Sequence, residues 1–105
     1  MSFFAVTTMC DNRVVAEKIA EALVETRAAA CVQISGPVSS VYRWKGAVEK
    51  AQEWRCTAKT RAALLETVET VIKDLHTYEL PEISVMRISG GSEEYLRWIE
   101  EETTL

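Results

Sequence analysis

Residues 31–59, CVQISGPVSSVYRWKGAVEKAQEWRCTAK, decide the fold of this chain. They read as two long antiparallel strands joined at Lys45-Gly46, because glycine takes the positive φ of a tight turn without steric cost. Apolar and polar side chains alternate from Trp54 to Lys59, which indicates one buried face and one polar face. Gly36-Pro37 interrupts the first strand as a bend or bulge, since proline cannot donate to a ladder. The stretch therefore predicts a long hairpin in the middle of the chain.

Shorter elements flank this hairpin on both sides. Residues 3–8 are aromatic and β-branched and predict a buried strand. Apolar residues at helical spacing from Val15 to Thr26 predict a helix, which Asp11 or Asn12 is expected to cap. The elements expected after the hairpin are a helix capped by Thr60 with an apolar stripe at 64–75, a strand at 83–88 and a short helix capped by Ser92.

The order of these elements predicts an α+β fold. A β-α-β-β-α-β order with a further C-terminal helix is the ferredoxin-like sandwich, a four-stranded antiparallel sheet with two helices on one face. The chain has 105 residues, 48% of them hydrophobic, and shows no repeat or linker. We therefore expect a single domain that spans residues 1–105.

The central hairpin is too long for two helices to cover, since an average strand has only about 5–6 residues. The surplus carries Val41, Tyr42, Trp44, Val48 and Trp54. An exposed, aromatic-rich edge invites pairing with another chain. We expect an obligate oligomer with Tyr42, Trp44 and Trp54 in its interface, because large rings bury much area there.

Charge excludes some classes of partner. The net charge is −4 and the isoelectric point is about 5.0. A nucleic-acid-binding surface would show a basic stripe, and docking on an anionic membrane would need clustered lysine and arginine. We therefore expect neither nucleic-acid nor membrane binding.

Cysteine usage favours a reducing compartment. Three cysteines, an odd number at wide spacing, do not suggest a disulfide framework, and one histidine with no CxxC pair excludes a zinc finger. The first residues lack the basic segment of a signal peptide, and the longest apolar run, 28–32, is far shorter than the ~20 residues that cross a bilayer. These features predict a cytoplasmic protein.

Five stretches of the sequence match a known family. They are 29–32 (AACV), 40–46 (SVYRWKG), 59–60 (KT), 76–82 (HTYELPE) and 95–99 (YLRWI). With these stretches in this order, the chain resembles the CutA divalent-cation tolerance proteins. The resemblance implies a ferredoxin-like domain, a homotrimer assembled through the long hairpins, and a function linked to copper or other divalent cations without enzymatic activity. The implied trimer is similar to that of PII-like signalling proteins.

Metal-ligating residue types gather at two places. His76 and Glu79 precede Pro81, and imidazole with a nearby carboxylate suits borderline metals, with further ligands supplied by a neighbour in a trimer. His76 can instead cap the end of a helix. Some CutA proteins carry a cysteine at the end of the first strand, proposed as a copper ligand; here that position falls on Thr8, with Cys10 following in the turn. Helix-start amides would lower the thiol pKa of Cys10 there.

A cleft between subunits is the second expected site. The residues expected in this ligand cleft are Lys59, Tyr78 and Cys31. Lys59, next to the predicted Thr60 cap, can form a small anion site at the helix start, or it is a solvated strand-end lysine. Cys31 can equally pack as a small hydrophobe. Such a cleft would suit the alternative function, a PII-like module that senses a small ligand or scaffolds an unknown protein partner. An acylphosphatase is disfavoured, because residues 9–13 contain no glycine for a phosphate-cradling loop.

Overall fold

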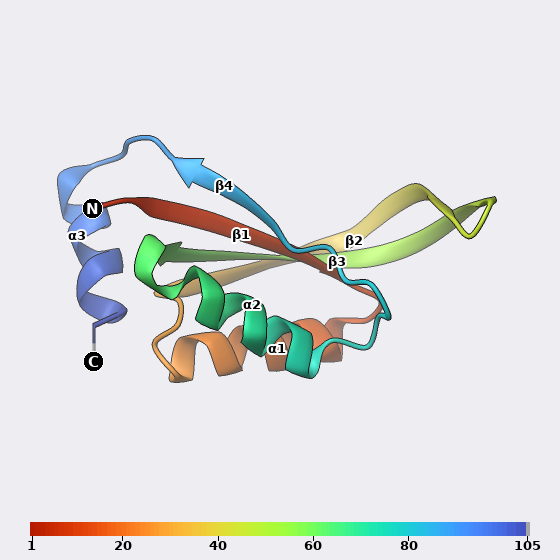
Figure 1. Cartoon of the computed structure of the whole chain (residues 1–105), viewed down its shortest axis with the longest axis horizontal. Helices are drawn as coiled ribbons and strands as arrows, with labels where there is room; N and C mark the ends of the chain where they lie inside the picture. The colour runs from red at the N-terminus through yellow and green to blue at the C-terminus, as the bar shows by residue number, and fades with distance from the viewer. Residues whose placement is uncertain (105) are drawn as a thin grey trace.

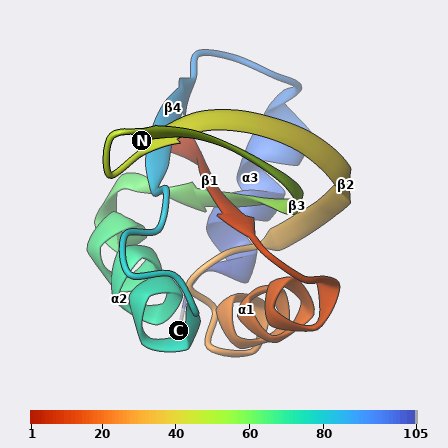
Figure 2. The same ribbon diagram turned by 90° about the vertical axis from the view of Figure 1, so that its right-hand side faces the viewer.

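The computed structural model describes residues 1–104, and within them four antiparallel strands form one sheet in the order β2-β3-β1-β4. The elements are β1 (Phe3–Cys10), α1 (Arg13–Glu25), β2 (Cys31–Trp44), β3 (Ala47–Arg61), the 3-10 helix η1 (Ala62–Leu64), α2 (Leu65–Leu75), β4 (Ser84–Ile88) and α3 (Glu93–Glu102). Helices α1 and α2 lie side by side on one face of the sheet (Figures 1 and 2). The predicted α+β arrangement is confirmed.

The main core lies between the sheet and these two helices. Val6 from β1, Ile19 and Leu23 from α1, and Val68 and Ile72 from α2 are each at most 2% exposed. Full burial stabilises such a side chain by roughly 1.5–3 kcal/mol. The apolar stripes read from the sequence are therefore what attaches both helices to the sheet.

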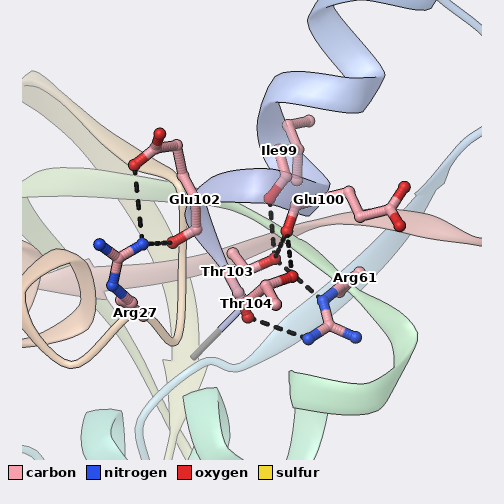
Figure 3. Close-up of polar contacts among 7 residues, drawn as sticks. All are labelled: Arg27, Arg61, Ile99, Glu100, Glu102, Thr103 and Thr104. Carbon is pink, nitrogen blue, oxygen red and sulfur yellow. Dashed lines mark hydrogen bonds and ion pairs between the residues drawn. The ribbon is translucent and has the colours of Figure 1, made fainter.

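Helix α3 lies at the end of the sheet away from the hairpin tip (Figure 1). Ile99 is fully buried there in a second, smaller cluster. Arg61 at the end of β3 donates to both the hydroxyl (3.0 Å) and the carbonyl (2.9 Å) of Thr103. Arg27 donates to the carbonyl of Glu102 and lies 3.8 Å from its carboxylate (Figure 3). These contacts fix the C-terminal end of α3 against the sheet.

The long hairpin is present as predicted. Lys45 and Gly46 form its turn with φ of 48° and 83°. At about 3.3 Å per residue the 14 residues of β2 extend about 46 Å, whereas the 13 residues of α1 reach only about 20 Å. The hairpin therefore projects beyond both helices (Figure 1). Val41 and Val48 on it are 66% and 60% exposed.

A bulge bends the hairpin where it leaves the helices. The register shifts between Ser35 and Val38, so that Gly36 and Pro37 have no partners of their own. A Cβ on Gly36 would lie 2.7 Å from the Cδ1 atom of Trp54, so only glycine leaves room for the indole. Trp54 is partly buried against the main core. Its ring therefore has a packing role within its own chain, beside the interface role expected for it.

The end of the first strand differs from the prediction. β1 ends at Cys10 and not at Thr8, because Cys10 still pairs with Trp54 on the long β3. Cys10 is fully buried and does not lie in a turn. It thus occupies the strand-end position that had been assigned to Thr8.

The helix cap assigned to Thr60 is also wrong. Thr60 pairs with Phe4 inside β3, and its hydroxyl donates to the carbonyl of Ala28 (2.6 Å). β3 continues to Arg61, since β1 offers it a partner as far as Phe3. Helix α2 begins only at Leu65, so Lys59 does not stand at a helix start.

The other two capping predictions are confirmed. The Asn12 side chain accepts from the amide of Val15 (2.9 Å), and the Ser92 hydroxyl accepts from the amide of Tyr95 (3.2 Å). Both caps satisfy an amide that the first helical turn leaves unpaired.

Two buried threonines should respond oppositely to loss of their hydroxyls. Thr60→Val removes the partner of the buried Ala28 carbonyl and should lower the free energy of unfolding by about 1–3 kcal/mol. The Thr8 hydroxyl has no partner within residues 1–104, so Thr8→Val should leave stability unchanged or raise it. Urea denaturation at one fixed protein concentration measures both. Equal losses in the two variants would contradict the assignment.

Candidate functional site

Residues 77–82, in the segment that joins α2 to β4, form one wall of a cleft of about 900 Å³. The other wall is the part of β2 that follows the bulge, from Val38 to Trp44, together with Glu53 and Arg55 of β3. The lining residues are Met9, Val38–Tyr42, Trp44, Glu53, Arg55 and Thr77–Glu82. The cleft therefore lies where the helix-covered sheet passes into the projecting hairpin.

His76 fastens this segment to the end of β1. Its backbone N–H donates to the carbonyl of Ile72 (2.9 Å), so His76 does end α2, as one reading of the sequence held. Its Nδ1 accepts from the amide of Tyr78 (3.1 Å), so the ring proton is on Nε2, which donates to the carbonyl of Met9 (2.8 Å). Both ring nitrogens are engaged.

Cys10 lies beside this imidazole. Its Sγ is 3.9 Å from Nε2 of His76. The hydrogen bond that the Cys10 thiol donates to Cys56, together with burial, raises the pKa of Cys10 above its ordinary value, whereas the sequence had suggested a lowered pKa. The expectation failed because Cys10 ends a buried strand and does not precede the helix amides.

Tyr78 and Glu53 form the polar floor of the cleft. The Tyr78 hydroxyl donates to Oε2 of Glu53 (2.7 Å), and the Glu53 residue is only 7% exposed. Burial, together with the hydrogen bond to the Glu53 carboxylate, raises the pKa of Tyr78 above its ordinary value. The Tyr78 and His76 rings are 4.9 Å apart, so Tyr78 links the cleft to the Cys10–His76 contact.

Glu79 points to the hairpin tip. Its Oε2 lies 3.5 Å from Nζ of Lys45, and both side chains are largely exposed. The Lys45 ammonium also lies 5.5 Å from the ring centroid of Trp44. Within residues 1–104 Glu79 forms no hydrogen bond or ion pair with His76 or Cys10, so one chain brings together two of the three predicted metal ligands.

Cys31 and Lys59 lie at the far end of the sheet from Tyr78. They are cross-strand partners, and Cys31 Sγ is 3.8 Å from the Tyr95 hydroxyl. Glu53, the partner of Tyr78, is six residues from Lys59 along β3, or about 20 Å. Within one chain these predicted cleft residues therefore separate into two groups.

Sequence reasoning missed Glu53. It lies on the face of β3 that also carries Arg55, and the alternation there reads as solvent-facing. Glu53 is nevertheless buried, and its carboxylate accepts a hydrogen bond from Tyr78, 25 positions later in the chain. No local pattern signals that contact.

Comparison with known proteins identifies the family. Residues 4–102 match the family described as "CutA1 divalent ion tolerance protein". The chain belongs to the CutA family. It is 44% identical over 89 residues to the Divalent-cation tolerance protein CutA of Thermus thermophilus, which covers 85% of this chain and 86% of that protein. The crystal structure of CutA from Xylella fastidiosa superimposes with a TM-score of 0.96 at 36% identity, over 99% of this chain and all of that one.

Other CutA relatives are longer or differ in location. The chain covers 58%, 57% and 50% of the length of the mouse, human and Arabidopsis proteins. The Arabidopsis protein is named chloroplastic, and the CutA of Archaeoglobus fulgidus is named periplasmic. Among residues 1–104 there is no helix whose length and hydropathy would let it span a membrane. The family thus occurs in more than one compartment.

The family name raises the question of whether this chain can hold a divalent ion. Cys10 and His76 are adjacent, but within the described residues no three His, Cys, Asp or Glu side chains gather as a metal group. His76 would also have to release the Met9 carbonyl to ligate through Nε2. One chain alone therefore does not fit a complete metal site.

Burial should rank the cysteines by reactivity. At pH 8, iodoacetamide should modify Cys31 first, because Cys10 and Cys56 are at most 2% exposed and the raised pKa of Cys10 leaves it less thiolate. Cys10 should react at least about tenfold more slowly than Cys31. Mass mapping of modified peptides measures this, with Cys31→Ser as the control that removes the fast phase. Fast modification in that variant would contradict the burial of Cys10.

Proposed function

We propose that this CutA protein is a homotrimer that binds copper or another divalent cation and so contributes to the response to metal ions. The family membership supports the tolerance function, and the contact between Cys10 Sγ and His76 Nε2 is the observation that carries the metal proposal. The relatives are named as tolerance proteins, and we propose action by binding and not by catalysis. A cytoplasmic location is part of the proposal.

The projecting hairpin supports assembly. Val41 and Val48 share one face of it, since Val48 pairs with Arg43, two residues from Val41. Tyr42 is 42% exposed beside them, and Trp44 lines the cleft. Apolar side chains that the helices of the same chain do not cover are typical of the interface of a permanent oligomer.

The oligomeric state tests this part of the proposal. Native mass spectrometry should give about 35 kDa, three times 11.8 kDa. Val41→Asp combined with Val48→Asp should yield monomers, because two carboxylates would be buried without partners. Val14→Asp, at a valine 61% exposed on α1, is the matched control and should stay trimeric. A wild-type mass of 11.8 kDa would refute the trimer.

The metal site is proposed at a junction between copies. Cys10 and His76 supply two donors from one chain, and Glu79, on the same segment as His76, is exposed enough to serve a neighbouring copy. Metal binding at Cys10 would displace its thiol proton, so affinity should fall as the pH is lowered. Thiolate and imidazole together suit copper well.

Calorimetric titration with Cu(II) tests the ligands. His76→Ala and Cys10→Ala should each weaken binding by about tenfold or more, since each removes a donor. Asp74→Asn, which removes an exposed carboxylate from the last turn of α2, should leave the affinity unchanged. Comparison among variants is needed because copper adheres to many sites. Equal affinities in all four proteins would exclude this site.

The cleft favours a second candidate function. Its volume of about 900 Å³ falls within the range of small-molecule pockets, and aromatic and charged side chains share its lining. A PII-like module that senses a small ligand or scaffolds a protein partner would use such a cleft. Ligand-induced shifts of the melting temperature would support this function.

A further inference from the structure

Two buried thiols are adjacent in the main core, on the face of the sheet that the helices cover. Cys10 on β1 is fully buried, and Cys56 on β3 is 2% exposed. The Cys10 thiol donates a hydrogen bond to Cys56, and the Cys56 thiol donates to the carbonyl of Ala16 on α1 (3.6 Å). The pair therefore lies inside one chain and not on the projecting hairpin that the proposed trimer would bury.

The buried hydroxyl of Thr8 belongs to the same place. Thr8 is 1% exposed, and its Oγ1 has no hydrogen-bond partner within residues 1–104. Thr8 is the cross-strand partner of Cys56 and stands two residues before Cys10, so all three side chains lie on one face of the sheet. A buried hydroxyl without a partner is costly, whereas a thiolate would accept a hydrogen bond from it. The Thr8 hydroxyl therefore marks a place where a deprotonated sulfur would be stabilised.

The spacing of the two cysteines favours a bridging ion over a disulfide. Cys56 pairs with Thr8, two residues before Cys10, so the cysteines are diagonal neighbours across the two strands. The Cα atoms of diagonal neighbours lie about 7–8 Å apart, whereas a disulfide needs a Cα separation of about 4.4–6.8 Å. An ion between the two sulfurs spans a longer distance than an S–S bond does.

The available donors favour a soft, monovalent ion. Zinc and calcium take about four or more ligands, and within the described residues no three His, Cys, Asp or Glu side chains gather as a metal group. Nε2 of His76 lies 3.9 Å from Cys10 Sγ, but it would have to release the Met9 carbonyl before it could ligate. Cu(I) differs, because two thiolates complete its coordination and it prefers sulfur donors.

We propose that Cys10 and Cys56 bind one Cu(I) ion per chain as two thiolates, with the Thr8 hydroxyl donating to a sulfur. Binding displaces the two thiol protons and transfers no electron, so the bound ion and its ligands together carry one negative charge. The Thr8 hydrogen bond stabilises that charge. The inference rests on the proposed copper function, for which it names the oxidation state and adds Cys56 as a ligand from the same chain.

Competition with the Cu(I) chelator bicinchoninate, without oxygen, tests the ligands. The wild-type protein should withdraw one Cu(I) ion per chain from the coloured chelate. Cys56→Ser should weaken Cu(I) binding at least about a hundredfold, because loss of a ligand costs more than loss of an outer hydrogen bond. Cys31→Ser removes the partly exposed cysteine and is the matched control, which should leave the affinity unchanged.

Thr8→Val tests the same site without removing a ligand. It should weaken Cu(I) binding about tenfold, since hydrogen bonds to metal ligands contribute that much to affinity. A purely structural role would not produce this loss, because the unpartnered hydroxyl adds nothing to stability in the metal-free protein. This variant gives an answer even where Cys56→Ser does not fold.

Three results would overturn the proposal. The first is that no Cu(I) passes from bicinchoninate to the wild-type protein. The second is equal affinity in wild type and Cys56→Ser or, where that variant does not fold, in wild type and Thr8→Val. The third is an equal loss in Cys31→Ser, which would place the copper on an exposed thiol. Titration of the same samples with Cu(II) separates the two copper proposals, since His76→Ala should weaken Cu(II) binding and leave Cu(I) binding unchanged.

Discussion

The pairing of β2 with β3 is the constraint on which the rest of the structure depends. A strand gains about 3.3 Å per residue and a helix only 1.5 Å, so strands and helices of similar residue number cannot cover one another. α1 and α2 cover the part of the hairpin that lies away from its turn, and the part near the turn projects with Val41, Tyr42 and Val48 exposed. The same ladder sets the length of β1, since Cys10 pairs with Trp54 as long as β3 continues. Strand pairing therefore decides both what is buried and what is left for partners.

The candidate sites lie at the boundary between these two parts. Where β1 ends, His76 contacts the Met9 carbonyl, and the residues that follow it, Thr77 to Glu82, form one side of the cleft. Tyr78 connects the Cys10–His76 contact with the cleft, because its backbone N–H donates to Nδ1 of His76 and its hydroxyl donates to Glu53.

The predictions made from short stretches of sequence were confirmed for features that residues close together in the chain form. The turn at Lys45-Gly46 and the caps at Asn12 and Ser92 each involve residues within three positions. Thr60 was misread because a threonine before a helical stripe is an ordinary cap, whereas here a partner strand holds it in the ladder. Cys10 was misread for the same reason, since its strand end is set by the length of β3.

The sequence by itself determined the order of the elements, the length of the hairpin, the two amphipathic helices and the family. These follow from periodicity, turn chemistry and motifs, which are local properties. Only the tertiary structure decided that Cys10 contacts His76, 66 positions away, and that Tyr78 donates a hydrogen bond to the carboxylate of Glu53. Both contacts arise from sheet register and from the path of one loop. Register depends on the whole ladder, so no single stretch of residues encodes which polar groups meet across it.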